Sequence, residues 1–554
     1  MKQTRPYCFA ALFAVCFFQP LFTRGQSPSR SGILSTMMRA TRFMADSVSE
    51  NGGFLSHYLP DLSRSWGEME AYPTMVWVQD PGTVSMGNTF LDCWKATGDD
   101  YYYQQARKAA SALVWGQLPC GGWNYFINFG GLNSTLKWYH TIGQNGWRLE
   151  EFQHYYGNAT FDDEVSSAAA LFLLRFYLAR LDPAFKPPLE KALGFVLKSQ
   201  YPLGGWPQRF PLMHDFHKNG DPDYTSFYTF NDNVLWQNIK FLTACYATLN
   251  LQQPYYAGGN TPILNAIRRA MNFLLISQQP RPYAGWAQQY TMDLKPASAR
   301  SYEPASLDPQ YTATNIELLL KCYEMTGDRR YIQRIGDAID WLKTAWIRST
   351  PQKDVFIYPK FVDPVTGVPL YTHRKGEDVI FGHYYDDRDS TRTVAHYGNF
   401  RRIDLGRIER DYQKVLSEAP DSVTAGSPLH PEKSGTPSPF DRFTEVMEYL
   451  NAYRGFGYRR PPSADRVDKI IRSLDDRGRW LVRGEYTSHP YDGNPRAGDS
   501  VTRKYMTTFV GDQYDTSPYR DTTDQLYIST SVYTRNMEIL IAGLNTTSDN
   551  PAKR

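Results

Sequence analysis

Apolar side chains recur at helical spacing through most of the first two thirds of the chain. Apolar positions three and four residues apart predict amphipathic helices, and the segments between these runs are rich in glycine and proline, which favour loops. The runs predict helices over residues 101–116, 164–181, 188–200, 234–249, 262–278, 311–326 and 329–346. A chain with this pattern is expected to be mainly α-helical.

The pattern changes in the last third of the chain. Residues 351–400 are rich in Tyr, Asp and Arg and indicate strands and loops, and proline and serine are frequent in 417–440. Helices are predicted again over 441–475 and 530–544, with short strands and polar loops between them. These segments are expected to be irregular and short-stranded additions to the helical part.

A loop that ends in tryptophan occurs three times in the helical part. The tryptophans, spaced about 80 residues apart, end the segments Pro119–Trp123, Pro202–Trp206 and Pro282–Trp286. Each loop is followed by an aromatic residue and an acidic turn, which is expected to open the next helix, at 161–164, 230–233 and 302–304. Repeated helix–loop–helix units favour an (α/α) toroid or barrel, in which the loops at one end gather around a common cleft.

The acidic turns would bring carboxylates from different repeats together in that cleft. Acids are common at helix N-termini as caps, but capping does not account for the aromatic residue before each acid or for the tryptophan loop upstream. Carboxylates that meet repel one another and favour a cation, and hard oxygen ligands suit Ca²⁺ better than Zn²⁺. The acids concerned are Asp162, Asp163, Asp232 and Glu303.

Arg300 lies three residues before Glu303. An arginine beside a carboxylate–Ca²⁺ cluster suits an anionic substrate, above all a uronic acid polymer. The cation would bridge protein and sugar carboxylates and acidify the proton on the adjacent carbon, so that a base could remove this proton and the glycosidic oxygen could leave by β-elimination. A buried Arg300–Glu303 ion pair that holds the loop is the alternative interpretation.

Composition and charge narrow the possible partners. Aromatic residues make up 15% of the chain, which is common in proteins that stack sugar rings and also compatible with an aromatic core. Without the first 25 residues, which carry three basic and no acidic side chains, the formal net charge falls from +3 to zero. A nucleic acid partner therefore lacks electrostatic support, and no later segment is long and apolar enough to span a membrane.

The N-terminus is typical of a secretory signal peptide. Lys2 and Arg5 form a charged start, Cys8–Phe18 is an apolar run too short to cross a membrane, and small residues precede Gln26. We therefore expect residues 1–25 to be removed and the protein to be secreted or periplasmic. The remaining cysteines are widely spaced, and we expect them to be buried as small apolar residues: Cys93, Cys120, Cys245 and Cys322.

Four segments of the helical part resemble the core motifs of family 10 pectate lyases. They read Gly-Gly-Trp-Pro-Gln at 204–208, Tyr-Thr-Phe-Asn-Asp-Asn at 228–233, Ala-Arg-Ser-Tyr-Glu-Pro at 299–304 and Asn-Ala-Thr-Phe-Asp-Asp at 158–163. The similarity covers roughly residues 100–412, in the order and near the spacing of the family. It implies an (α/α) toroid-like catalytic domain and Ca²⁺-assisted cleavage of polygalacturonate.

The resemblance also implies roles for individual residues. Arg300 matches the catalytic base of the family, and the matching acids at its Ca²⁺ and substrate centre are Asp162, Asp232 and Glu303. A free guanidinium has a pKa above about 12, so a base role requires that this pKa be strongly lowered. Further substrate contacts are expected from Asp163, Trp206, Gln208, Tyr302, Tyr384 and Arg388, with core packing as the equal alternative for Trp206.

Two cationic positions of the family pattern differ in this chain. The first Gly-Gly-Trp motif of the family continues Pro-Lys-Asn, whereas Trp123 is followed here by Asn-Tyr-Phe. The family segment Ile-Phe-Ser-Gly-Arg-Asp-Gly, with a substrate-binding arginine, is matched to residues 380–386, which places Tyr384 near the arginine and leaves Arg388 as its substitute. These differences bear on which uronic acid polymer is cleaved more than on the type of reaction.

The expected organisation is a signal peptide (1–25), a toroid domain (26–412), a Pro/Ser-rich linker or insertion (413–440) and a C-terminal region (441–554) that completes or flanks the cleft. We expect a monomer that acts on an acidic polysaccharide. One alternative is a glycoside hydrolase on the same fold, with Asp162 or Asp163 and Asp232 as the acid–base pair. The other is a binding protein that keeps the cleft without turnover.

Overall fold

The computed structural model describes residues 28–143, 157–212, 223–249, 261–300, 302–375, 383–394, 399–430, 438–451, 462–491 and 518–545. The predicted signal peptide lies outside the described residues. In the described part, no helix is both long and apolar enough to cross a membrane.

The helices are α1 (Arg30–Phe43), α2 (Thr83–Thr97), α3 (Asp100–Gly116), α4 (Gly131–Tyr139), α6 (Val165–Arg180), α7 (Lys186–Ser199), α8 (Val234–Leu249), α9 (Thr261–Ser277), α10 (Pro309–Thr326), α11 (Ile335–Ala345), α12 (Leu405–Ser417), α13 (Pro420–Val423), α14 (Pro439–Asn451), α15 (Ala464–Ser473) and α16 (Thr530–Leu544).

The strands are short and pair antiparallel in several small sheets. One sheet joins the two ends of the described chain, in the order β16-β19-β1-β2-β3, with His57 opposite Ser529. Two more have the orders β10-β11-β15 and β12-β13-β14. The strands are β1 (His57–Tyr58), β2 (Ser65–Trp66), β3 (Glu70–Ala71), β4 (Met75–Trp77), β5 (Phe126–Asn128), β6 (Ala159–Thr160), β7 (Arg209–Phe210), β8 (Tyr228–Thr229), β9 (Gln289–Tyr290), β10 (Arg348–Ser349), β11 (Val355–Pro359), β12 (Phe361–Val362), β13 (Pro369–Lys375), β14 (His383–Asp387), β15 (Phe400–Asp404), β16 (Leu481–Val482), β17 (Tyr486–Ser488), β18 (Pro518–Arg520) and β19 (Tyr527–Ser529).

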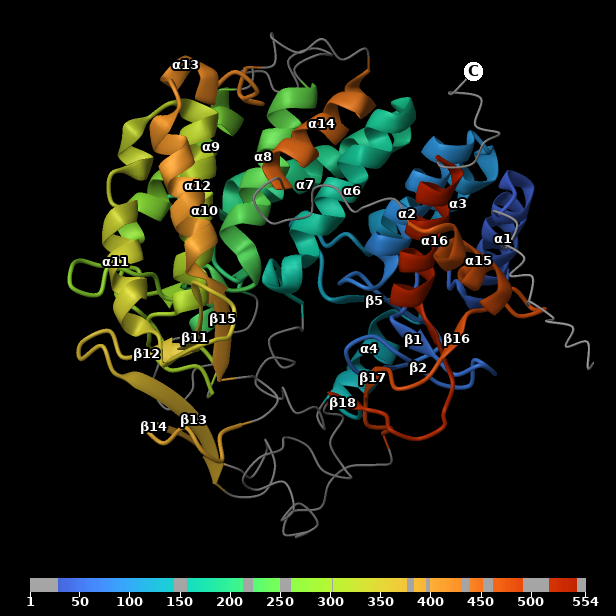
Figure 1. Cartoon of the computed structure of the whole chain (residues 1–554). Coiled ribbons are helices and arrows are strands. Elements are labelled where there is room, and N and C mark those ends of the chain that lie inside the picture. Colours follow the sequence, from blue (N-terminus) through green and yellow to red (C-terminus); the bar gives the residue numbers. More distant parts are fainter. Residues whose placement is uncertain are drawn as a thin grey trace, which may run out of the picture.

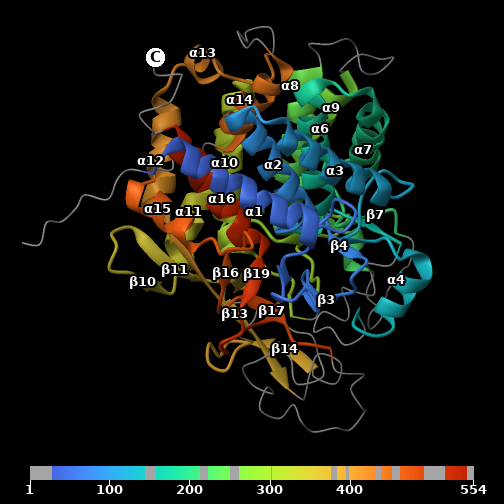
Figure 2. The ribbon, with the colours of Figure 1, turned by 90° about the vertical axis from the view of Figure 1, so that its right-hand side faces the viewer.

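The helices pack as inner and outer layers of a toroid. The inner helices α16, α2, α6 and α8 follow one another around the wall, and α14 packs against α6 and α8. The outer helices α3, α7 and α9 each contact an inner neighbour, and α10 packs against α9, α11 and α12. Figures 1 and 2 show these helices at one end and most of the strands at the other. The predicted mainly α, (α/α) toroid fold is confirmed.

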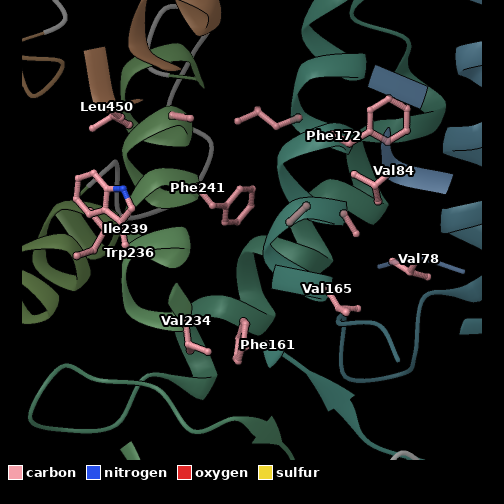
Figure 3. Close-up of a cluster of buried hydrophobic side chains, with 14 of the residues drawn as sticks. Val78, Val84, Phe161, Val165, Phe172, Val234, Trp236, Ile239, Phe241 and Leu450 are labelled. Carbon is pink, nitrogen blue, oxygen red and sulfur yellow. The ribbon is translucent and has the colours of Figure 1, made fainter. Parts of the chain in front are cut away.

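The inner helices are buried because their sequences are apolar on nearly all sides. Almost every residue of α8 is buried, including the polar Asn238 and Thr243, as expected for a helix surrounded by other helices. Figure 3 shows Phe161 and Val234 at the same end of the toroid wall, where α6 and α8 begin. The acidic turns that precede these two helices therefore lie side by side.

The repeated tryptophans fix each loop to the outer helix that precedes it. Trp123, Trp206 and Trp286 are fully buried, and each indole N–H donates to a carbonyl of the preceding outer helix, at Leu113, Val196 and Leu274. A buried tryptophan needs such a partner for its N–H. Trp206 is therefore packed inside the protein, as in the alternative to its expected sugar contact.

Most predicted helices are present with small shifts at their ends, but three features differ. The run over 329–346 is divided into a 3₁₀ helix (Arg329–Ile332) and α11. Helix α10 is opened by Asp308, whose carboxylate accepts hydrogen bonds from the N–H groups of Gln310 and Tyr311, and not by the segment 302–304. Helices α1, α2, α4, α12 and α13 were not predicted. The four cysteines are free thiols, and all except the half-buried Cys120 are buried.

Candidate active site

A fully buried carboxylate, Asp162, lies at the centre of the candidate site. It follows β6 and begins the 3₁₀ helix η3 (Asp162–Glu164) that leads into α6. Its Oδ1 accepts a hydrogen bond from Nε2 of Gln208 at 2.6 Å, and its Oδ2 accepts from Nη2 of Arg300 at 3.1 Å and from the hydroxyl of Tyr125. These donors satisfy a charge that would otherwise be costly to bury.

Arg300 bridges Asp162 to Glu303. Its backbone N–H donates to Oε2 of Glu303 at 3.0 Å, and Nη1 lies 3.3 Å from Oε1 of the same carboxylate. Arg300 and Glu303 are 4% and 3% exposed. The structure thus brings Arg300, Asp162 and Glu303 together as the sequence predicts, and the ion pair that holds the loop is also present. Because both oxygens of Glu303 face Arg300, Glu303 is poorly placed as the expected metal ligand.

A second pair of acids, Asp163 and Asp232, lies beside this centre in strained backbone. Asp163 (φ 46°) in η3 and Asp232 (φ 51°) in η6 (Asn231–Asn233) occupy the same position before α6 and α8. Non-glycine residues in this left-handed region cost about 1–3 kcal/mol each and cluster at functional sites. Nε2 of Gln79 donates to Asp163 at 2.8 Å, and Nδ2 of Asn231 donates to Asp232 at 2.6 Å.

The acids repel one another strongly. Burial raises the pKa of Asp232 well above its usual value, and the carboxylates of Asp163 and Asp162 raise it further. In the described part of the chain, no three His, Cys, Asp or Glu side chains form a ready metal site. Asp163 and Asp232 nevertheless fit a hard divalent cation, because oxygen ligands suit it, because a cation would relieve this repulsion, and because water and substrate oxygens can complete such a site.

The expected substrate residues Tyr302 and Tyr384 lie on one face of the β13–β14 hairpin. Their ring centroids are 5.5 Å apart, and the hydroxyl of Thr372 in β13 donates to the carbonyl of Tyr302 at 3.3 Å. Arg374 lies two residues along β13, opposite Tyr384 in the register, so its side chain emerges on the same face as Thr372. Arg374 is 3% exposed.

A second stretch of the chain, which contains Arg374, can also be matched to the family segment. The match at 380–386 rests on the shared Ile-Phe pair. The segment 370–376 reads Leu-Tyr-Thr-His-Arg-Lys-Gly, with an arginine fifth and a glycine seventh, as in Ile-Phe-Ser-Gly-Arg-Asp-Gly. Arg388 is exposed instead and lies near Asp363, whose pKa is lowered by backbone hydrogen bonds from Thr366 and Val365 and then by Arg388. Arg374, buried on the face that carries Thr372, is therefore a second candidate for the role expected of Arg388.

Tyr125 stands where the family pattern has its lysine, and Arg209 stands behind it. Nη2 of Arg209 donates to the Tyr125 hydroxyl at 3.3 Å, and the guanidinium lies over the Tyr125 ring. Both side chains are fully buried. The Tyr125 hydroxyl therefore accepts a hydrogen bond from the charged Arg209 and donates one to Asp162. Sequence reasoning missed this pair because the two residues lie 84 positions apart.

We expect Tyr125→Phe to lower both stability and turnover. Loss of the hydroxyl leaves Asp162 and Arg209 with one partner fewer, which costs about 1–3 kcal/mol, and loosens the carboxylate that orients Arg300. The matched control is Tyr533→Phe, which removes a buried hydroxyl bonded to Thr41 away from the site. Urea unfolding should show a loss of stability in both variants. The initial rate of the expected uronic acid polymer cleavage should fall in Tyr125→Phe alone. Equal rates in the two variants would exclude a role of Tyr125 in the site.

Lys360 is a further cation that the motifs did not indicate. It directly follows β11 and is 3% exposed. Burial lowers its pKa to about 7, and Glu303 opposes this shift. The Lys360 ammonium therefore lies in the field of the Arg300–Glu303 pair.

We expect Lys360→Met to stabilise the protein at pH 6 by up to about 4 kcal/mol and much less at pH 10. Below pH 7 the lysine is charged in both states, and the folded state bears its full desolvation cost. Between pH 7 and about 10.4 the unfolded state binds the extra proton, so the stability of the parent protein rises with pH. Urea unfolding at both pH values measures the difference, with the exposed Lys198→Met as control. A gain that does not change with pH would contradict the assignment.

Comparisons with known proteins give the same assignment as the motifs. Residues 128–356 match the sequence model of the pectic acid lyase family, and no curated protein matches the chain. The family 10 polysaccharide lyase from Cellvibrio cellulosa is 17% identical, with 60% of this chain and 97% of that one covered and a TM-score of 0.40. A variant of it in complex with trigalacturonic acid is also 17% identical, with 60% and 98% covered and a TM-score of 0.39.

The chain is also similar, at lower sequence identity, to the solved structure of a hydrolase. The GH76A α-1,6-mannanase from Salegentibacter sp. HEL1_6 is 10% identical, with 93% of this chain and 99% of that one covered and a TM-score of 0.35. At this level the structural matches carry no conclusion about activity, and the family match stands on the sequence. The resemblance is therefore confirmed: residues 128–356 of this chain carry the sequence pattern of the pectic acid lyase family.

Proposed function

We propose that this protein is a secreted lyase that cleaves a uronic acid polymer of the polygalacturonate type by Ca²⁺-assisted β-elimination. The observation that supports it most is the buried guanidinium of Arg300, held between Asp162 and Glu303 beside the acid pair Asp163 and Asp232. The signal-like N-terminus supports secretion, and we propose that the protein acts as a monomer.

The proposed reaction assigns a task to each part of the site. Asp163 and Asp232 would hold Ca²⁺, which when bound neutralises a sugar carboxylate and acidifies the adjacent C–H. Asp162 and Glu303 orient Arg300, which must be in its neutral form, favoured by a nearby cation and by alkaline pH, to take that proton from carbon. The electron pair of the C–H bond forms the double bond, and the C–O bond to the next sugar breaks with its electrons on oxygen, which takes a proton from water. Tyr302, Tyr384 and Arg374 are proposed to contact the sugars.

The hydrolase alternative is less well supported by the residues available for it. Asp162 is fully buried and accepts hydrogen bonds from Tyr125, Gln208 and Arg300, so its carboxylate is not placed to exchange protons with a sugar. The raised pKa of Asp232 would suit a general acid with Asp163 as its general base, so the hydrolase alternative rests on this one pair.

Cleavage in heavy-oxygen water separates the candidate functions. Purified protein from Gln26 onward is incubated with polygalacturonate, and the products are examined by mass spectrometry. A lyase yields one fragment lighter by a water molecule and incorporates no heavy oxygen. A hydrolase incorporates one heavy oxygen per cleaved bond, and a binding protein yields no fragments. Fragments that gain one solvent oxygen per cleaved bond, with no fragment lighter by a water molecule, would overturn the proposed function.

A further inference from the structure

The two acids proposed to hold the cation each accept a hydrogen bond from a side-chain amide. Nε2 of Gln79 donates to Oδ2 of Asp163 at 2.8 Å, and Nδ2 of Asn231 donates to Oδ2 of Asp232 at 2.6 Å. Both acids have left-handed backbone, with φ of 46° and 51°. Such a conformation persists only where the surrounding structure fixes it. The two amides are part of what fixes these carboxylates.

Each amide is in turn oriented by an aromatic donor. The indole N–H of Trp77 donates to Oε1 of Gln79 at 2.8 Å, and the hydroxyl of Tyr311 donates to Oδ1 of Asn231 at 3.0 Å. Because the aromatic group takes the amide oxygen, the NH₂ group is left to face the acid, and an ionised carboxylate can only accept. We call these two hydrogen-bonded series the triplets: Trp77–Gln79–Asp163 and Tyr311–Asn231–Asp232.

The indole of the first triplet is held firmly in the core. Trp77 is 1% exposed, and its ring packs against those of Phe126 and Trp138, with centroids 5.3 and 6.3 Å away. Gly67 also touches the ring, since a Cβ on this glycine would lie 2.0 Å from the indole. The direction of the indole N–H, and through it that of the Gln79 amide, is therefore set by the core.

The first triplet draws its donors from a part of the chain that precedes the family match at 128–356. Strand β4, which ends at the indole, pairs with β5, and the N–H of Val78 donates to the carbonyl of Tyr125 at 2.8 Å. The hydroxyl of Tyr125 donates to Asp162. The paired strands therefore present donors to two consecutive acids, Asp162 and Asp163.

We propose that Gln79 and Asn231 are positioning residues of the cation site, whose amides fix the carboxylates of Asp163 and Asp232 as the oxygen pair that takes up Ca²⁺. This inference rests on the proposed function and deepens it, since it assigns the outer hydrogen bonds of the same site. Carboxylates that ligate a metal are commonly hydrogen-bonded in this way, and loss of such a partner weakens metal binding by about 10–100-fold.

Calorimetric titration with Ca²⁺ tests the first triplet. The background is the chain from Gln26 onward with Arg300→Lys, in which little turnover is expected, and Ca²⁺ is added alone and with galacturonic acid trimer. Gln79→Met removes the amide and keeps the length of the side chain. Gln117→Met is the matched control, because Gln117 is also half-buried and its amide also makes two hydrogen bonds, to backbone carbonyls. We expect Gln79→Met to weaken Ca²⁺ binding about tenfold or more and Gln117→Met to leave it unchanged.

A second pair of variants tests the other triplet. Tyr311→Phe removes the hydroxyl that orients Asn231 and accepts from the backbone N–H of Asp232 at 2.9 Å. Tyr533→Phe removes a buried hydroxyl bonded to Thr41 away from the site. Both variants should lose stability in urea unfolding, but Tyr311→Phe alone should weaken Ca²⁺ binding, by about tenfold. A merely structural role would change the urea midpoint and leave the Ca²⁺ affinity as it is.

The outcomes separate this inference from the proposed reaction. Unchanged Ca²⁺ affinity in both Gln79→Met and Tyr311→Phe would overturn the positioning role even if the parent protein cleaves polygalacturonate. The same holds if the background protein binds no Ca²⁺ with or without the trimer. Ca²⁺ binding that depends on Gln79, in a parent protein that forms no unsaturated product, would support the positioning role and overturn the lyase proposal.

Discussion

Arg300→Ala is expected to lower the rate of uronic acid polymer cleavage by about 10²–10⁴-fold, the range that a positioned acid or base contributes. The guanidinium is the group that faces both Asp162 and Glu303, and alanine offers neither a base nor a positive charge. Initial rates of product formation at saturating substrate measure the effect. A folded Arg300→Ala protein with the parent turnover would exclude Arg300 as the base.

The control for this variant must separate folding from chemistry. Removal of the guanidinium leaves two buried carboxylates uncompensated, which costs about 3–5 kcal/mol when a buried ion pair is broken. Arg300→Lys keeps the positive charge but lacks the planar fork that reaches both partners. We therefore expect Arg300→Lys to recover most of the lost stability in urea unfolding and little of the lost activity. Full recovery of both would indicate that Arg300 acts through its charge alone.

Asp232→Asn is expected to lower Ca²⁺-stimulated activity by about 10–100-fold and to raise the Ca²⁺ concentration needed for half of the maximal rate. The substitution removes one of the two carboxylates proposed to hold the cation. Ca²⁺ titration of the initial rate measures both effects. Unchanged Ca²⁺ dependence would remove Asp232 from the proposed cation site. Asp182→Asn, at an exposed turn before α7, is the control for a lost acidic cap.

The same variant should gain stability when no cation is added. Because the pKa of Asp232 is raised in the folded state, the folded state binds more protons than the unfolded state, and stability falls as pH rises above the unfolded value of about 3.9 toward the raised pKa. Asp232→Asn should therefore melt at a higher temperature than the parent at pH 8 and at about the same temperature near pH 3. A lower melting temperature at pH 8 would contradict the repulsion inferred at this site.

The helical part of the fold was predictable because its inner helices carry long apolar runs. The runs over 164–181 and 234–249 correspond to α6 and α8 within a residue or two. Helix α2 was missed although its glycine C-cap, Gly98 at φ 73°, is a recognisable stop signal. The break within 329–346 depends on how Tyr331 and Ile332 turn into the core, which periodicity alone does not show.

Site contacts between residues close in the sequence were predictable. Contacts between loops of different repeats were less so. Arg300 and Glu303 are three residues apart, and their ion pair follows from local spacing. The contacts of Asp162 with Tyr125 and Gln208 join three separate loops. The roles of Trp206 in packing and of Arg374 beside Tyr384 depend on which face of a loop or strand is turned inward, and an aromatic or cationic residue type does not determine that face.

Ultraviolet absorbance of the unsaturated product tests the central claim most directly. Protein from Gln26 onward is mixed with polygalacturonate at alkaline pH, with Ca²⁺ in one cuvette and a chelator in the other. The account predicts a steady rise in absorbance with Ca²⁺, little change with chelator, and no rise for Arg300→Ala in either. A flat trace for the parent protein with Ca²⁺, while the folded protein still binds galacturonic acid oligomers, would contradict it.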